Sequence, residues 1–297
     1  MFSWIEETLP MVFLALLDGT VTAFVLALIA LGLSLVFGVM RIVNVAHGEF
    51  FMLGAVLSWF AYHWTDDALW GFVLALLAAP AIVGFIAVFS ERYILRKVDY
   101  NPESTIVATI GILYIIQQLT LMGFGPEARP VEAPIYFRVS FPWFGYSGYK
   151  LLVAVMSGLC LCGVWLLLKR TKLGLYMRAT QQDYEIATTF GVPTKKIYAS
   201  VFALGGSLAA LAGVLVVPIR QADHLMGLEP LLLSFIVVII GGLGSIRGTI
   251  IAAFLIGISD GIISVFYEPT LAKMLATLFV VMILIIKPSG LFGDNQQ

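Results

Sequence analysis

Three side chains able to take part in acid–base chemistry or polar binding stand between two strongly apolar runs. Asn44, His47 and Glu49 supply an amide, an imidazole and a carboxylate within six positions. His47 and Glu49 could form the catalytic pair of a membrane-embedded enzyme, but they are two residues apart and so not on one helical face. Removing such groups from water is expensive, and they are retained where water or a partner reaches them. The three residues therefore indicate a place where water or a partner contacts the protein.

A second polar segment, residues 169–196, is the longest charged stretch of the chain. It predicts a short helix over residues 181–190, ended by Gly191 at the C′ position and by Pro193 two residues later. Small side chains permit close approach of a partner, and charged ones can surround the contact. The residues expected to take part are Asp183, Glu185, Ala187 and Gly191. The alternative is an ordinary amphipathic cytosolic loop.

Glycines gather in a third segment, at Gly241, Gly242, Gly244 and Gly248. A spacing of four residues lets membrane helices pack closely, so the run predicts helix packing or gating. It could form a tight connection between two spans or the tip of a re-entrant segment. Asp260 follows in the next apolar run. We expect it to face the bundle interior on the substrate pathway, or else to bond a neighbouring helix.

The elements that must position these residues are membrane helices. Of the 297 residues, 60% are apolar and 12% are charged, whereas soluble proteins carry about 25% charged residues. Apolar runs long enough to cross a bilayer predict nine spans: 19–39, 48–63, 70–90, 104–123, 150–168, 197–217, 228–245, 248–265 and 271–287. We therefore expect an all-α polytopic bundle of about eight to ten transmembrane helices, forming one domain over residues 1–297, with broken or re-entrant segments.

The polar segments 44–49 and 241–248 each follow a long apolar span and precede another. Transporters often contain internal repeats with broken helices at the solute site. We therefore expect a pseudo-repeat that relates residues 20–120 to residues 195–287.

Nine spans place the termini on opposite sides, and Lys and Arg indicate the sides, because short cytoplasmic loops are enriched in them. With the N-terminus outside, twelve fall inside: Arg41, Arg92, Arg96, Lys97, Lys169, Arg170, Lys172, Arg178, Lys195, Lys196, Arg247 and Lys287. Five fall outside: Arg129, Arg138, Lys150, Arg220 and Lys273. This predicts an N-terminus outside and a cytoplasmic C-terminus.

Two further segments are expected on the outer face. Residues 123–149, rich in proline and aromatic residues, predict a folded cap loop. Residues 1–17 would suit a short interfacial helix. Since no basic residue precedes Arg41, these residues lack the positive region of a signal peptide and belong to the mature chain.

The chain lacks the patterns of nucleotide-dependent catalysis. No Gly-Lys dipeptide occurs, so there is no P-loop, and ATP hydrolysis would come from another subunit. Cys160 and Cys162 would point about 200° apart on a helix, so neither a disulfide nor a metal site follows. The net charge of −1 and the absence of a separate basic patch do not suggest nucleic acid. We expect no enzyme activity and no cofactor or metal in this chain.

All three segments resemble permease subunits of bacterial ABC importers. Residues 44–49 match the Asn-x-Ala-His-Gly-Glu signature of permeases for branched-chain and other hydrophobic amino acids. Residues 241–248 are similar to the glycine-rich run of those permeases. Residues 185–191 resemble the cytoplasmic "EAA" loop, with Ile186 where the motif has Ala and without its downstream Ile-x-Leu-Pro.

The resemblance implies an importer of the bacterial inner membrane. A second, similar permease, two cytoplasmic ATPases that bind ATP and Mg²⁺, and a periplasmic binding protein with most of the selectivity would be its partners. Residues 185–191 would dock on an ATPase, while Asn44, His47 and Glu49 would line or brace the inner portion of the pathway. The solute would be a hydrophobic amino acid, urea, an amide or an organic acid. The alternative is a stand-alone channel or secondary carrier for a small neutral solute.

Overall fold

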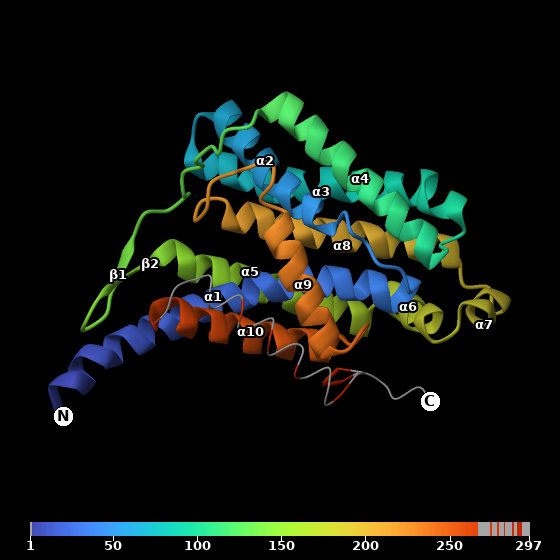
Figure 1. The fold of residues 1–297 in the computed structure, drawn as a ribbon. Coiled ribbons are helices and arrows are strands. Elements are labelled where there is room, and N and C mark those ends of the chain that lie inside the picture. Colours follow the sequence, from blue (N-terminus) through green and yellow to red (C-terminus); the bar gives the residue numbers. More distant parts are fainter. Residues whose placement is uncertain are drawn as a thin grey trace.

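The computed structural model is a bundle of long helices with a small β-hairpin at one end (Figure 1). It describes residues 2–266, 274, 278, 282, 287 and 290–292, so most of the predicted span 271–287 lies outside the described residues. The elements are α1 (Phe2–Met40), α2 (His47–Thr65), α3 (Ala68–Tyr93), the 3₁₀ helix η1 (Leu95–Val98), α4 (Pro102–Phe124), β1 (Arg138–Ser140), β2 (Gly145–Ser147), α5 (Gly148–Arg170), α6 (Lys172–Gln182), α7 (Tyr184–Thr189), α8 (Thr194–Val216), α9 (Leu228–Gly241) and α10 (Ile246–Phe266).

The predicted all-α membrane architecture is confirmed. Within the described part of the chain, six helices are long and apolar enough to cross a membrane, namely α1, α3 with η1, α4, α5, α8 and α10. The helix α9 is apolar but shorter. One end of the bundle carries β1 and β2, and we call it the hairpin end. The opposite end carries α7 and is called the α7 end (Figure 1).

The first helix differs from the prediction. Residues 1–17 were expected to form a separate interfacial helix, but α1 continues without a break from Phe2 to Met40. Pro10 lies inside it near its start, and Thr20 satisfies its hydroxyl by donating to the Leu16 carbonyl oxygen at 2.7 Å. Apolar residues continue on both sides of the predicted boundary and form one helix of spanning composition.

Two helices begin deep inside the bundle. After α1 the chain turns back at Arg41, which has φ +55°, and residues 41–46 form no helix. The ring nitrogen Nε2 of His47, the first residue of α2, lies 2.9 Å from the Ile29 carbonyl oxygen. Ile29 precedes the end of α1 by about 16 Å of helix, at 1.5 Å per residue. The start of α9 lies at the same depth, because Gly227 is packed against the Gly48 backbone.

The packing pattern is the one that an inverted repeat produces. α1 and α8 run in opposite directions and cross where a methyl group on Gly32 would lie 2.7 Å from the Gly205 carbonyl oxygen. α1 packs on α10 as α8 packs on α3, while α2 contacts α8 and α3 as α9 contacts α1 and α10. In this arrangement α1, α2 and α3 correspond to α8, α9 and α10.

The same arrangement corrects the predicted pairing of the two polar segments. The counterpart of the break at 41–46 is the segment 217–227 between α8 and α9, and not the glycine run at 241–248. That run is a tight connection from α9 to α10, with Gly242 and Gly244 at φ +98° and +79°. In the second repeat, the shortened helix is α9.

The termini of the described chain lie at opposite ends. α1 begins at the hairpin end, whereas the Leu291 amide at the α7 end donates to the Ile240 carbonyl oxygen at 2.7 Å.

Close backbone contact between α2 and α8 generates the first prediction. A methyl group on Gly54 would collide with the Ala210 carbonyl oxygen, whereas one on Gly111 of α4 would meet no atom within 4 Å. We expect Gly54→Ala to lower the free energy of unfolding by about 1–3 kcal/mol through overpacking. Gly111→Ala should raise it by up to about 1 kcal/mol through helix propensity. Unfolding of both variants in detergent measures the difference, and equal effects would contradict the packing described.

Candidate functional site

The predicted polar segment lies buried where α2 begins. Asn44, His47 and Glu49 are all almost completely inaccessible. The Asn44 side-chain oxygen accepts a hydrogen bond from the Ala46 amide at 3.1 Å, which closes a local turn before the helix. Glu49 lies in the first turn of α2, where the helix dipole favours a carboxylate. Gln117 of α4 donates to Glu49 Oε1 at 3.1 Å.

Each of these three side chains keeps one buried polar atom without a hydrogen-bond partner among the described residues. The atoms are Asn44 Nδ2, His47 Nδ1 and Glu49 Oε2. Buried polar atoms in proteins are almost always paired with protein or ordered water. The segment therefore has unused capacity to bind water, a passing solute or a group from a partner.

Asp260, predicted on the same pathway, lies elsewhere. It lines a cavity of about 360 Å³ between α1, α5, α8, α9 and α10 on the hairpin side. The two regions are nevertheless adjacent, because Ile29 and Phe51 line this cavity and Ile29 also contacts His47 through its carbonyl oxygen. The polar segment thus lies directly behind the inner wall of the cavity.

Four further charged residues line the cavity, and the sequence did not identify them as site residues. They are Asp18, Lys150, Arg220 and Glu229. A signal was present, since Asp18 is the single charged residue between residues 8 and 40. From the sequence, Lys150 and Arg220 were noted only as basic residues expected on the outer face.

The predicted docking helix is a separate short element, α7. Residues 181–190 were expected to form one helix, but Asp183 is extended (φ −155°) and divides α6 from α7. Its carboxylate caps α7 by accepting from the Ile186 amide at 2.8 Å. At the other end Gly191 adopts φ +82° at the predicted C′ position. The Gly191 and Val192 amides donate to the Thr188 and Ala187 carbonyl oxygens, both at 3.0 Å, as in a Schellman motif.

The predicted docking residues on and beside α7 differ in their exposure to solvent. Ala187 is only 4% exposed, so its methyl group packs against the protein and anchors the helix. Asp183, Glu185 and Gly191 are exposed. The most exposed large apolar side chains of this segment are Ile186 at 56% and Phe190 at 84%, neither of which was predicted as a docking residue.

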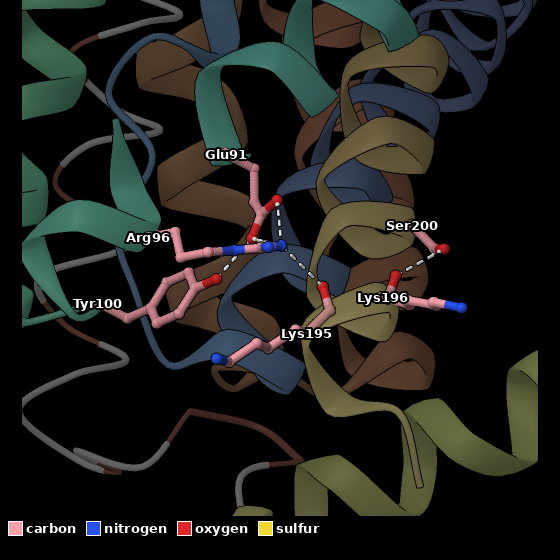
Figure 2. A network of polar contacts seen from close by, with 6 residues as sticks. All are labelled: Glu91, Arg96, Tyr100, Lys195, Lys196 and Ser200. Atoms are coloured by element: carbon pink, nitrogen blue, oxygen red, sulfur yellow. Dashed lines mark hydrogen bonds and ion pairs between the residues drawn. The ribbon is translucent and has the colours of Figure 1, made fainter. Parts of the chain in front are cut away.

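A polar network ties the start of α8 to α3 and η1 (Figure 2). Arg96 contacts the buried carboxylate of Glu91 at 3.2 Å and donates to the Lys195 carbonyl oxygen at 3.3 Å. Tyr100 donates to the same carboxylate. Burial raises the pKa of the Tyr100 hydroxyl above its ordinary range, and acceptance by Glu91 adds to the shift, so the phenol stays protonated. Glu91 is the only acidic residue in α3, so its position in an apolar helix could have identified it from the sequence as a residue with a polar partner.

Aromatic contacts extend this network to α7. Tyr100 packs on Tyr198 of α8 with ring centroids 4.8 Å apart, and Tyr198 packs on Tyr184 of α7 at 5.4 Å. The glycine run lies nearby, since Gly244 packs on Gly38 and its carbonyl oxygen accepts from Gln181 at 3.4 Å. The α7 end therefore has continuous packing from the exposed helix into the bundle.

Two helices that start at half depth, beside buried polar groups, and a capped helix displayed at one end define a polytopic membrane protein of the transport class. The family model of the branched-chain amino acid transport system permease component matches residues 15–286. The chain belongs to this family.

Relatives agree with this assignment, and a solved structure shows a similar fold. The chain is 24% identical over 292 residues to the high-affinity branched-chain amino acid transport system permease protein BraD of Pseudomonas aeruginosa, covering 94% of each. It is also 24% identical over 295 residues to the corresponding protein LivH of Escherichia coli K12, covering 93% of this chain and 94% of that one. PsaBC from Streptococcus pneumoniae, solved with a Fab, shares the fold with a TM-score of 0.53 at 13% identity, over 98% of both chains.

The contact between Gln117 and Glu49 generates a prediction with a matched control. Gln117→Leu should leave Glu49 Oε1 unpaired and lower the free energy of unfolding by about 1–3 kcal/mol. The neighbouring Gln118 is exposed and points about 100° away from Gln117 around α4, so Gln118→Leu should change little. Denaturation of both variants in detergent gives the comparison, and similar stabilities would show that the Glu49 contact is unimportant.

Proposed function

We propose that the chain is the membrane-spanning permease subunit of an ABC importer that carries a small solute, in particular a hydrophobic amino acid. Its partners would be a second, similar permease, two ATPase subunits that bind ATP and Mg²⁺, and a periplasmic solute-binding protein. The observation that carries the proposal is α7, a helix capped at both ends that displays Ile186 and Phe190 to solvent. The names of the relatives support the amino acid as solute.

The exposed helix distinguishes this proposal from a stand-alone channel or secondary carrier. A carrier that works alone has no need for large apolar side chains on a cytoplasmic helix, because such groups usually mark a protein contact. Here they surround a buried anchor, Ala187, and are flanked by the exposed charges of Asp183 and Glu185. An apolar centre with a charged rim is the usual composition of a docking surface.

The distribution of basic residues supports a cytoplasmic α7 end. The twelve Lys and Arg residues expected inside all lie at or next to the α7 end of the helices. The hairpin end holds Arg129, Arg138, Lys150 and Arg220, while Lys273 lies outside the described residues. By the positive-inside rule the N-terminus is periplasmic and the C-terminus cytoplasmic.

In this function, closure of the ATPases would move α7 and, through it, the bundle. The aromatic contacts and the network of Figure 2 join α7 to α8 and α3. α8 then reaches the cavity at Val216, and α2 and α9 begin beside it at half depth. A shift of these helices would change which side of the bundle has access to the buried polar segment.

The docking surface is tested by removing its most exposed apolar side chain. Phe190→Ser should abolish or strongly weaken co-purification with the ATPase subunits and ATP-dependent uptake in reconstituted vesicles, because the apolar centre of the contact is lost. Trp143→Ser removes a side chain that is 54% exposed at the hairpin end and should leave both unchanged. If Phe190→Ser retains full association and coupling, α7 is not the docking element.

The orientation is tested by cysteine labelling. In a chain with Cys160 and Cys162 replaced by Ser, Ser140→Cys on β1 should react with a membrane-impermeant maleimide in spheroplasts. Thr189→Cys on α7 should react only after the membrane is opened. Both residues are exposed, so labelling in the reverse order would overturn the proposed topology.

A further inference from the structure

The cavity on the hairpin side contains paired opposite charges. Lys150 Nζ lies 2.6 Å from Asp18 Oδ1, and the Tyr146 hydroxyl donates to the same oxygen at 2.7 Å. Asp18 Oδ2 takes part in neither contact. A second pair, Arg220 and Glu229, lies 3.4 Å apart. Both pairs are partly exposed, so they are open to a ligand that enters from the hairpin end.

Apolar side chains form the deeper wall of the same cavity. They include Val25, Leu26 and Ile29 of α1, Phe51 of α2 and Leu233 of α9. A volume of about 360 Å³ is near the lower limit of small-molecule sites, which span roughly 300–1,000 Å³. The cavity therefore combines a polar entrance with an apolar interior on the scale of a small metabolite.

We propose that this cavity is a solute-recognition site of the permease itself, specific for a zwitterionic amino acid with an apolar side chain. The inference rests on the import function proposed above. Lys150 binds the α-carboxylate, Asp18 binds the α-ammonium group through Oδ2, and the side chain packs on the wall formed by Ile29 and Phe51. Selectivity is then shared between the permease and its binding protein.

The charge pairs explain why a zwitterion fits better than other small solutes. An amino acid brings one charge of each sign, so it can join the Asp18–Lys150 pair without adding net charge to a partly buried site. A dicarboxylate would add two negative charges to a cavity lined by three acidic residues, Asp18, Glu229 and Asp260, and two basic ones, and excess charge of one sign in such a place is costly. Urea carries no apolar part to cover the inner wall. The structure thus selects among solutes that the sequence left open.

The position of the cavity agrees with a site that is occupied before translocation. It opens at the hairpin end, and its inner wall includes Ile29 and Phe51 at the depth where α2 begins. The next polar groups inward are His47 and Glu49, each with an unpaired buried atom. A solute that leaves the cavity inward therefore meets hydrogen-bonding groups immediately.

The experiment uses the complete transporter complex in nanodiscs, without nucleotide or binding protein, and radiolabelled L-leucine as the probe. L-Leucinol lacks the carboxylate, and 4-methylpentanoate lacks the ammonium group. We expect L-leucine to bind at least about tenfold more tightly than either analogue, as expected for one lost charge-assisted hydrogen bond. Urea and glutarate should not compete.

Single substitutions assign the two charged groups. Lys150→Met should weaken L-leucine binding about tenfold without weakening the binding of L-leucinol, a cation that the uncompensated Asp18 attracts. Asp18→Asn should weaken L-leucine about tenfold without weakening 4-methylpentanoate, an anion that the uncompensated Lys150 attracts. Arg138→Met removes a cation from the same end but outside this cavity and should change nothing. If a single variant misfolds, the double variant Asp18→Asn/Lys150→Met removes both charges together and should bind all three compounds equally.

The outcomes separate this inference from the proposed function. Absence of ATPase subunits or of ATP-dependent uptake of any amino acid would overturn the import function. If uptake is present but L-leucine does not bind, or if Lys150→Met weakens L-leucine and L-leucinol equally, the import function stands and the recognition site is wrong.

Discussion

No water is available in the hydrocarbon core to pair with free peptide groups, and this constraint governs the whole bundle. A helix that starts at half depth leaves backbone groups unpaired unless neighbouring protein pairs with them. At the first break the Val45 amide donates to the Thr109 hydroxyl at 3.3 Å, and the Ala46 amide is bonded by the Asn44 side chain. At the second break Arg129 and Ala222 exchange two backbone hydrogen bonds of 2.8 Å. The surrounding packing therefore supplies part of the hydrogen bonding that the broken helices require.

The same constraint explains why polar residues gather where they do. A break in a helix creates both a need for hydrogen bonds and a place where polar side chains can be held. The side chains of Asn44 and Thr109 accept hydrogen bonds from backbone amides of the first break. Glu49 follows in the first turn of the helix that begins there. The residues that stabilise the irregular backbone also bring unpaired polar atoms close to a cavity. In this fold, the requirement for stability and the opportunity for binding arise at one location.

Much of the fold could be predicted from sequence because it depends on composition along single segments. Apolar runs predicted the helices, the distribution of Lys and Arg followed the two ends, and Gly191 marked the end of α7. The errors arose where the structure is determined by contacts between segments far apart in the sequence. The start of α2 beside Ile29 and the pairing of the 41–46 break with 217–227 depend on how α1 crosses α8, which no local pattern contains. The cavity was missed for the same reason, since Asp18 and Lys150 are 132 positions apart.

The contact between Gly48 and Gly227 restricts which residues these two positions can hold. A methyl group on either glycine would collide with the carbonyl oxygen of the other, so each position forbids a side chain at its counterpart and neither can compensate for a change in its partner. The starts of α2 and α9 therefore touch through backbone alone, and a larger residue at either position would have to push these two helix starts apart.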